Sequence, residues 1–318
     1  MYSRIITLFV LMAVWIPQVF MQSTPEDKTI LFQSVSADTE SSSDLYTASD
    51  NVTEIEPLTE LGVAYYPTWL SDGSSILFVE DGIENDRIVL LNADDNTMTE
   101  VISSDDEKLL EKNVLGLSYP VMSPDAKFLA FVAAVEDQQN ASDIYLLDMQ
   151  SGELSLLTDN NAIEKDLQFS QDSSRLLFLS DLDNEDEFFT YRIHVIEIPS
   201  QTELIIPNPF PSDPVSPRWS SDDNIVFASS VESWRLYTVD LLNLEANLYY
   251  TGELLDFGNI QAFDIDIATE KIVLSGCSSS PSSCEIYVVD IGEATVLQIT
   301  NNEVLDAFPS WQPIVLDT

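Results

Sequence analysis

A phrase of about twelve residues recurs along the chain, and it constrains the fold more than any other feature. It is clearest at residues 67–78, Pro-Thr-Trp-Leu-Ser-Asp-Gly-Ser-Ser-Ile-Leu-Phe, and it returns at residues 120–131, 167–178 and 217–227. A degenerate copy covers residues 263–274, and a last copy begins at Pro309, close to the end of the chain. The large apolar residue of successive copies is spaced by 46 to 53 residues, at Trp69, Met122, Phe169, Trp219, Ile265 and Trp311. Repeats of roughly 40 to 50 residues with strand-like content are typical of β-propeller blades.

A second phrase follows in each unit, as in Asp143-Ile-Tyr-Leu-Leu-Asp148. Its six copies are rich in β-branched and aromatic residues and begin at Asp44, Arg87, Asp143, Arg192, Arg235 and Glu285. This composition predicts a strand that is buried on both faces between two neighbouring blades. Turn signals such as Ser71-Asp-Gly73 separate the strands, and a final apolar-polar strand closes each unit. We therefore expect four strands in each blade.

The two ends of the chain hold complementary fragments of one unit. Residues 28–32 read as a second strand with no first strand ahead of it, whereas residues 309–312 read as a first strand with nothing after it. Pairing between them would remove open sheet edges that otherwise template aggregation. The sequence thus predicts an all-β fold: a six-bladed β-propeller of four-stranded blades, closed by pairing of the C-terminal strand with the three N-terminal strands. Residues 24–318 would form this single β-propeller domain.

Residues 1–23 differ from the rest of the chain. Arg4 precedes an almost uninterrupted apolar run over residues 5–20, which is shorter than the roughly 20 apolar residues of a membrane span. This pattern predicts an export signal cleaved after about Ser23, with an uncleaved signal anchor as the alternative. No second apolar stretch is long enough to span a bilayer. We expect a soluble protein, periplasmic or extracellular, with no membrane insertion after the signal is removed.

The two phrases are similar to the repeat of TolB-type propellers, whose consensus resembles Pro-x-Trp-Ser-Pro-Asp-Gly followed by a strand ending in Phe and then Ile-Tyr-x-x-Asp. The likeness extends over residues 28–313 and is closest at residues 67–78 and 120–148. It implies a propeller fold but is a poor guide to function, because one propeller can host many activities. TolB itself carries an additional N-terminal domain that engages envelope partners. Only about four residues separate the expected cleavage site from the first strand here, so we do not expect a Tol–Pal role.

The charge balance excludes some classes of partner. Twelve Lys and Arg residues face 55 Asp and Glu residues, which gives a net charge of −43. A protein that tracks nucleic-acid phosphates needs cations to displace counterions, so we exclude that class. Docking on anionic lipid is disfavoured for the same reason. Acids spread over all units indicate a surface-wide property, and solubility, a saline habitat or attraction of a basic partner would each produce it.

The residues that could carry catalysis are few. His194, the only histidine, occupies the slot that tyrosine fills in most copies, so we interpret it as a core residue and not as a general base. No Gly-x-Ser-x-Gly elbow or phosphate-cradling glycine loop is present. The acidic run at residues 181–187 is a weak calcium candidate and is better interpreted as a solvated hairpin tip. The sequons at Asn51 and Asn140 matter only in a eukaryotic secretory pathway.

Cys277 and Cys284 are the only cysteines and lie at the facing ends of two strands expected to form one hairpin. Hairpin ends lie side by side, at about the Cα separation that a disulfide needs. A zinc or redox site would need a Cys-x-x-Cys pair or additional histidines. We therefore predict a disulfide, which agrees with export into an oxidising compartment.

Together these features predict an exported, non-enzymatic β-propeller that binds or scaffolds a protein partner or another ligand in the cell envelope or outside the cell. Docking would use one rim or the central channel, and the molecule is expected to be monomeric. We assign no catalytic, cofactor-binding or metal-binding residue and expect no cofactor. The alternative is a propeller enzyme that acts on a carbohydrate through acidic residues, with or without a divalent cation.

Overall fold

The computed structural model describes residues 28–36, 42–51, 55–135, 141–182, 191–207, 212–221, 223–230, 234–250, 257–277, 283–302 and 304–313. These residues form strands almost throughout, with one short helix, α1 (Glu107–Leu110). No helix in this part of the chain is long and apolar enough to cross a membrane. The export signal expected at residues 1–23 lies outside the described residues.

Four separate sheets each contain four antiparallel strands that are consecutive in sequence. Their strands are β4 (Ala64–Trp69), β5 (Ser75–Asp81), β6 (Asp86–Asn92) and β7 (Met98–Ser103); β8 (Val114–Met122), β9 (Phe128–Val135), β10 (Ser142–Asp148) and β11 (Leu154–Leu156); β12 (Glu164–Phe169), β13 (Arg175–Ser180), β14 (Arg192–Glu197) and β15 (Thr202–Ile206); and β16 (Val215–Ser221), β17 (Asn224–Ser230), β18 (Trp234–Asp240) and β19 (Glu245–Tyr250). The predicted all-β fold of four-stranded antiparallel sheets is confirmed.

The remaining eight strands are linked into one sheet. They are β20 (Asn259–Asp266), β21 (Lys271–Cys277), β22 (Cys284–Asp290), β23 (Thr295–Gln298), β24 (Leu305–Trp311), β1 (Thr29–Val35), β2 (Ser43–Ser49) and β3 (Ile55–Pro57). Only one parallel bridge, between Cys284 and Leu305, joins β22 to β24. The sheet therefore consists of two four-stranded antiparallel units, β20 to β23 and β24-β1-β2-β3.

The second of these units is made from both ends of the described chain. β24 pairs antiparallel with β1, so that Trp311 lies opposite Ile30 and Leu305 opposite Val35. The backbone of Gln312 also donates a 2.9 Å hydrogen bond to the carbonyl of Thr29. This is the pairing between chain ends that the repeat register predicts.

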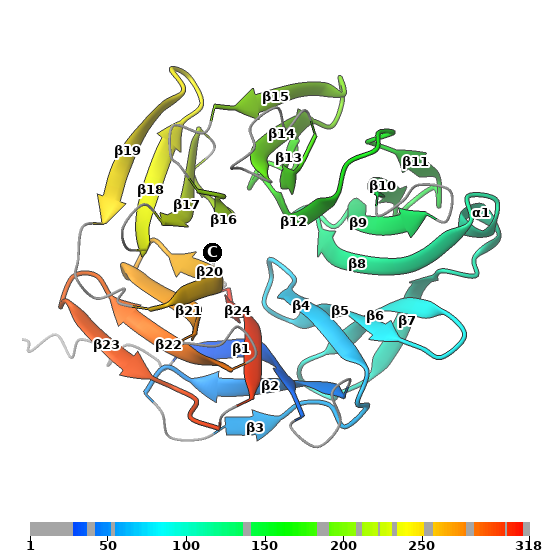
Figure 1. Ribbon diagram of the computed structural model, residues 1–318. Coiled ribbons are helices and arrows are strands. Elements are labelled where there is room, and N and C mark those ends of the chain that lie inside the picture. Colours follow the sequence, from blue (N-terminus) through cyan, green and yellow to red (C-terminus); the bar gives the residue numbers. More distant parts are fainter. Residues whose placement is uncertain are drawn as a thin grey trace, which may run out of the picture.

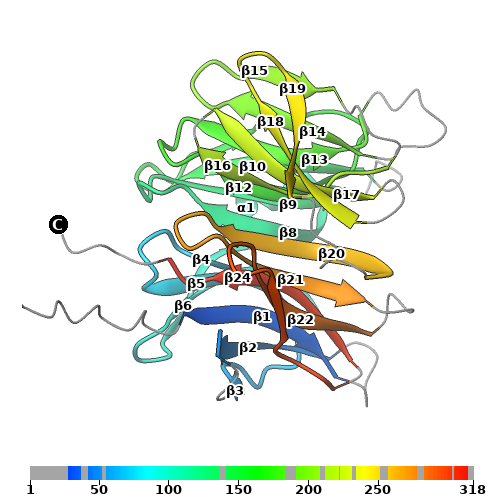
Figure 2. The ribbon, with the colours of Figure 1, turned by 90° about the vertical axis from the view of Figure 1, so that its left-hand side faces the viewer.

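The units lie side by side around a common centre, each with its first strand innermost (Figure 1), and Figure 2 shows the molecule from the side. The innermost strands contact one another in sequence order: β4 with β8, β8 with β12, β12 with β16, β16 with β20, β20 with β24, and β24 with β4. Six buried apolar clusters fill the spaces between neighbouring units. Stability therefore depends on faces that only adjacent units can cover.

A stacked ring pair recurs inside these units, between the second strand and the third. The ring centroids are 5.3 to 5.9 Å apart in Phe32–Tyr46, Phe131–Tyr145, Phe178–His194 and Phe227–Tyr237. His194 is fully buried in this pair and takes the place of tyrosine, as the repeat predicts.

A β-bulge interrupts the innermost strand of the units at a recurring position. The residue three before the large apolar residue has a positive φ, between 45° and 56°, in five units: Tyr66, Tyr119, Asp166, Ser216 and Phe308. Bulges re-aim a side chain, and the left-handed conformation costs a non-glycine residue about 1–2 kcal/mol. Of these residues, Tyr66, Tyr119, Asp166 and Phe308 line a cavity at the centre of the molecule.

Truncation of the chain before Leu305 is expected to unfold or aggregate the protein. The change removes the buried Trp311 side chain and exposes the edge of β1, so the free energy of unfolding should fall by more than about 4 kcal/mol. Thermal melting with light scattering measures this loss. Removal of residues 314–318 alone is the control, and an unchanged melting curve for the longer truncation would contradict the pairing.

Replacement of Ser216 by glycine is expected to stabilise the protein. Ser216 has a φ of 45°, is fully buried and leaves its hydroxyl without a hydrogen-bond partner in the described part of the chain. Ser216→Gly relieves both penalties, so we expect a gain of about 1 kcal/mol in urea unfolding, whereas Ser216→Val should destabilise. Ser230→Gly, in a strand position without positive φ, should cost stability instead.

Candidate functional site

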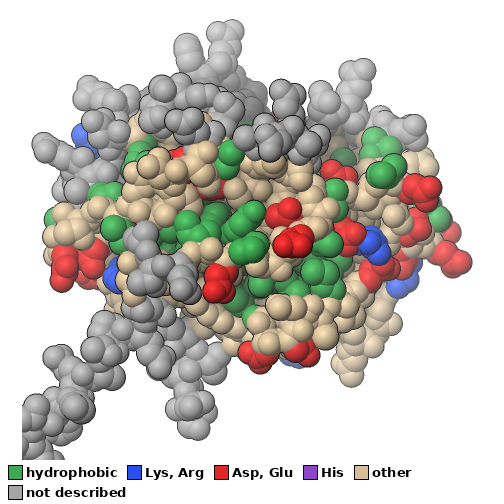
Figure 3. Space-filling model, turned by 90° about the horizontal axis from the view of Figure 1, so that it is seen from below, with side chains coloured by type: hydrophobic (Ala, Val, Ile, Leu, Met, Phe, Trp, Pro, Cys, Tyr) green, Lys and Arg blue, Asp and Glu red, His purple; other side chains and the backbone are tan. Residues whose placement is uncertain are grey.

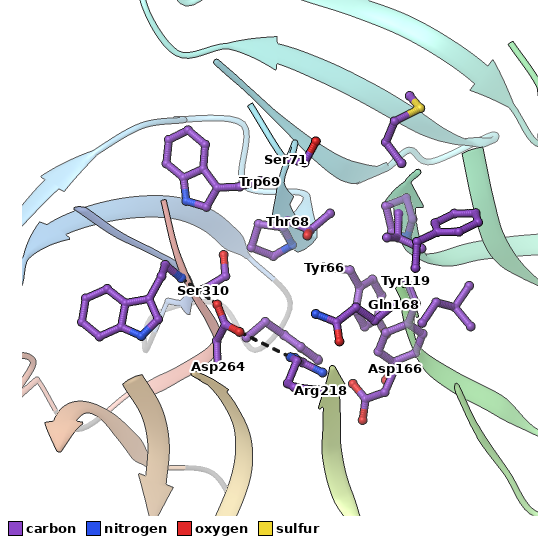
Figure 4. Close-up of a pocket in the computed structure, with 18 of the residues that line it drawn as sticks. Tyr66, Thr68, Trp69, Ser71, Tyr119, Asp166, Gln168, Arg218, Asp264 and Ser310 are labelled. Atoms are coloured by element: carbon purple, nitrogen blue, oxygen red, sulfur yellow. Dashed lines mark hydrogen bonds and ion pairs between the residues drawn. The ribbon is translucent and has the colours of Figure 1, made fainter. Parts of the chain in front are cut away.

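Two sets of side chains from the innermost strands face a cavity of about 250 Å³ at the centre of the molecule (Figure 4). The residue directly before the large apolar residue of each copy lines this cavity in all six units. Five of these six residues are polar or charged, and we call the set the polar ring: Thr68, Val121, Gln168, Arg218, Asp264 and Ser310. The cavity opens where the innermost strands end and turn, beside Ser71, Pro124 and Pro313, and is named the strand-end cavity.

The bulged residues form the floor of the strand-end cavity. Tyr66, Tyr119 and Phe308 pack together, with ring centroids 4.5 Å apart for the two tyrosines and 5.1 and 6.0 Å from them to Phe308. Asp166 completes the floor on the side of β12. The tilted and edge-on ring geometry is the favourable arrangement for aromatic clusters. The floor is therefore an apolar platform with one carboxyl group at its margin.

The polar ring carries one cation and one anion. Arg218 Nε lies 3.7 Å from Asp264 Oδ1, and Asp264 Oδ2 accepts a 2.9 Å hydrogen bond from the backbone of Trp311. Burial raises the pKa of Asp264, and Arg218 opposes this effect. Gln168 Oε1 accepts a 2.8 Å hydrogen bond from the backbone of Trp219, so its amide nitrogen remains as a donor at the cavity.

Asp166 adds a further ionisable group. Burial raises the pKa of this carboxyl, while Arg218 and Lys165 favour its charged form. With Asp166 ionised, the cavity wall carries a net charge of −1 from one cation and two carboxylates.

Two more cavities, of about 270 and 450 Å³, lie where the innermost strands begin. We call them the strand-start cavities. The smaller one shares Tyr119, Asp166 and Phe308 with the strand-end cavity, so the floor residues separate the two sides. Lys165 and Tyr119 line both strand-start cavities.

Lys165 is the cation at the wall of both strand-start cavities. Its ammonium group lies over the ring of Tyr191, 3.6 Å from the centroid. Within the described ranges it forms no ion pair with a carboxylate, whereas Lys28, Arg87, Lys127, Arg175, Arg218 and Lys271 each do. The strand-start side thus presents a positive group that a ligand can reach.

Glu164 is a buried acid at the larger strand-start cavity. It is 2% exposed; its Oε1 accepts a 3.0 Å hydrogen bond from Asn160, and its Oε2 has no partner in the described part of the chain. Burial raises its pKa to about 8. Asp306 is fully buried at the same repeat position and accepts from Asn302 at 3.1 Å. The sequence predicts acidic side chains spread over the surface, but Glu164 and Asp306 are buried.

The other residues singled out from the sequence lie away from these cavities. His194 Nδ1 is 2.7 Å from Glu203 Oε1 inside its unit, and Cys277 and Cys284 form a disulfide with Cα atoms 4.1 Å apart. The disulfide spans the facing ends of β21 and β22, as predicted. Most of the acidic run at residues 181–187, Asn140, and residues 52–53 of the other sequon lie outside the described residues.

None of the polar-ring or floor residues is predicted as a site residue from the sequence. A signal for them was present, because they stand one and three positions before the large apolar residue of each copy. The sequence does not show the bulge at these positions, nor that residues from different units meet at the centre.

The protein is expected to lose stability as the pH rises toward 8, and replacement of Glu164 by glutamine should abolish this pH dependence. Between the ordinary value of 4.5 and about 8, the unfolded chain releases the proton while folded Glu164 retains it, so the free energy of unfolding falls as pH rises through this window. The side chain of the variant does not titrate in this window. Between pH 5 and pH 8, the free energy of unfolding should therefore fall less in the variant than in the parent, by on the order of a few kcal/mol. Urea unfolding at several pH values measures this difference. The exposed Glu153→Gln variant should follow the parent, and parallel curves for Glu164→Gln would show that Glu164 ionises normally.

No protein-family model matches this sequence, and no curated protein matches it significantly. Solved structures do resemble the fold. TolB from Acinetobacter baumannii aligns with a TM-score of 0.70 and 15% identity over 90% of this chain and 67% of that chain. A putative TolB from Agrobacterium tumefaciens aligns with a TM-score of 0.59 and 16% identity, over 90% of this chain and 91% of that one.

An oligogalacturonate lyase in complex with manganese also resembles this chain, with a TM-score of 0.55 and 13% identity over 80% of this chain and 70% of that chain. At these identities the likeness concerns the fold and not the activity. The recurring strand phrases, the four-stranded units and the structural matches agree. The chain has a TolB-like β-propeller fold.

Proposed function

We propose that this protein is an exported, non-enzymatic binding or scaffolding module, built as a closed six-bladed propeller. In this proposal residues 1–23 are an export signal and residues 24–318 form a single domain that works as a monomer in the periplasm or outside the cell. Six apolar clusters between six four-stranded units and the contact of β24 with β4 support closure. The likeness to TolB structures supports an envelope location.

The partner is proposed to be a protein segment that enters the strand-start cavities. Their walls combine apolar side chains such as Val132, Ile163 and Ile260 with amide groups from Asn259 and Gln261. Ligand sites are typically concave and mostly apolar with a few placed polar groups, and we expect the same of a site for a protein segment. No bound metal or cofactor is part of this proposal.

Lys165 is the observation that carries the proposal. In a chain of net charge −43, a cation held over Tyr191 at the wall of two open cavities is suited to an acidic side chain of the partner. The acidic surface repels an acidic partner at long range. Such a partner binds only where its contact with Lys165 offsets this repulsion, which favours a specific partner over general adhesion.

Reversal of the charge at Lys165 tests this site. A photo-crosslinking residue at Asn259 in the full chain, expressed in cells, should yield a discrete protein adduct that mass spectrometry identifies. Lys165→Glu should lower the adduct yield about tenfold or more, as expected for a lost charged hydrogen bond worth about 1.5–3 kcal/mol.

Two controls make the result specific. Lys112→Glu makes the same charge change at an exposed position and should leave the yield unchanged. A crosslinker at Leu242, which is 80% exposed on the periphery, should not give the same adduct. Identical adducts from both positions, or no response to Lys165→Glu, would contradict the proposal.

An enzyme acting on a carbohydrate is the weaker alternative. Its support is the likeness to the oligogalacturonate lyase structure, together with the carboxyl groups at the central cavities. A chromogenic or viscosity assay with polygalacturonate and manganese would favour it if turnover were lost in Asp166→Asn.

A further inference from the structure

We propose that the strand-end cavity is a separate binding site for a neutral sugar ring, either a monosaccharide or the end of an oligosaccharide. The inference does not depend on the protein partner, because the floor residues separate this cavity from the strand-start cavities. It rests on three properties of the cavity: its aromatic floor, its polar ring and its charge.

The floor provides a surface on which a sugar can stack. The negative face of an aromatic ring attracts the weakly positive C–H groups of a pyranose, and Tyr66, Tyr119 and Phe308 present such rings together. Their positive φ angles hold the side chains at the centre despite the conformational cost. The platform is thus formed before any ligand arrives.

The polar ring provides hydrogen-bonding groups of both kinds. Gln168 and Arg218 present N–H donors, Asp264 presents a carboxyl acceptor, and Thr68 presents a hydroxyl.

The charge of the wall selects a neutral ligand over an anion. With Asp264 and Asp166 both ionised, these two carboxylates outnumber Arg218, and the wall is net negative inside an acidic molecule. A negatively charged ligand would be repelled by this wall. The hydroxyl groups of a neutral sugar can both donate to the carboxylates and accept from the N–H groups. A purely apolar ligand would leave the polar ring unpaired at a cost.

The volume agrees with a small ligand. About 250 Å³ lies below the roughly 300–1,000 Å³ typical of sites for drug-sized ligands, so one sugar ring, with further rings outside the mouth, suits the cavity.

Saturation-transfer NMR and calorimetry on the full mature chain test the site. The probes are D-glucose, D-galactose, D-mannose and N-acetyl-D-glucosamine, with D-glucuronate as the charged counterpart. At least one neutral sugar should bind, and glucuronate should bind at least about tenfold more weakly because of the added charge.

Variants locate the binding. Gln168→Ala should weaken the neutral sugar about fivefold through a lost hydrogen bond, and the exposed Gln150→Ala should not. Because Gln168 also holds the backbone of Trp219, Thr68→Val, which conserves shape, is the second variant and should give a similar loss with an unchanged melting temperature. Asn259→Ala, at the smaller strand-start cavity and outside the strand-end cavity, should leave sugar binding intact, which separates this site from the proposed partner site.

Three outcomes would overturn the inference. These are absence of binding by all four neutral sugars, tighter binding of glucuronate than of the neutral sugars, and sugar binding that is insensitive to both Gln168→Ala and Thr68→Val.

Discussion

The fold depends on each sheet burying both of its faces. A four-stranded antiparallel sheet whose middle strands are apolar on both sides, as β10 is, cannot be covered by solvent-facing loops and must pack between two similar sheets. The six apolar clusters lie between neighbouring units, and none of the units forms a core by itself. Pairing of β24 with β1 extends this arrangement to the two ends of the chain, where an unpaired edge would otherwise remain.

The bulge in the innermost strands connects the fold to the candidate site. In a regular strand, residues one and three positions before the large apolar residue share the face opposite to it. The extra residue rotates the chain, and side chains from different units converge at the centre. The strain is tolerated because the flanking pairs with the second strand fix the backbone on both sides.

Charge is organised differently outside and inside the molecule. Seen from the side of β3, acidic side chains are spread over the surface among apolar and neutral ones (Figure 3). Inside, Glu164 and Asp306 each accept a hydrogen bond from an asparagine in the loop ahead of their strand and so anchor that loop. The central cavities combine few charges of both signs, which suits recognition by hydrogen bonding more than by bulk electrostatics.

The spacing of Trp69, Met122 and their counterparts determined the strand repeat, and the fragments at residues 28–32 and 309–312 determined which ends pair, because both follow from local patterns of apolar residues. The same patterns placed His194 in a core slot and brought Cys277 next to Cys284. The tertiary structure alone decided the strand-end cavity, the position of Lys165 over Tyr191 and the burial of Glu164. These properties depend on where a bulge turns a side chain and on which neighbour desolvates it, and the pattern within one unit does not show which residues of the other units will face it.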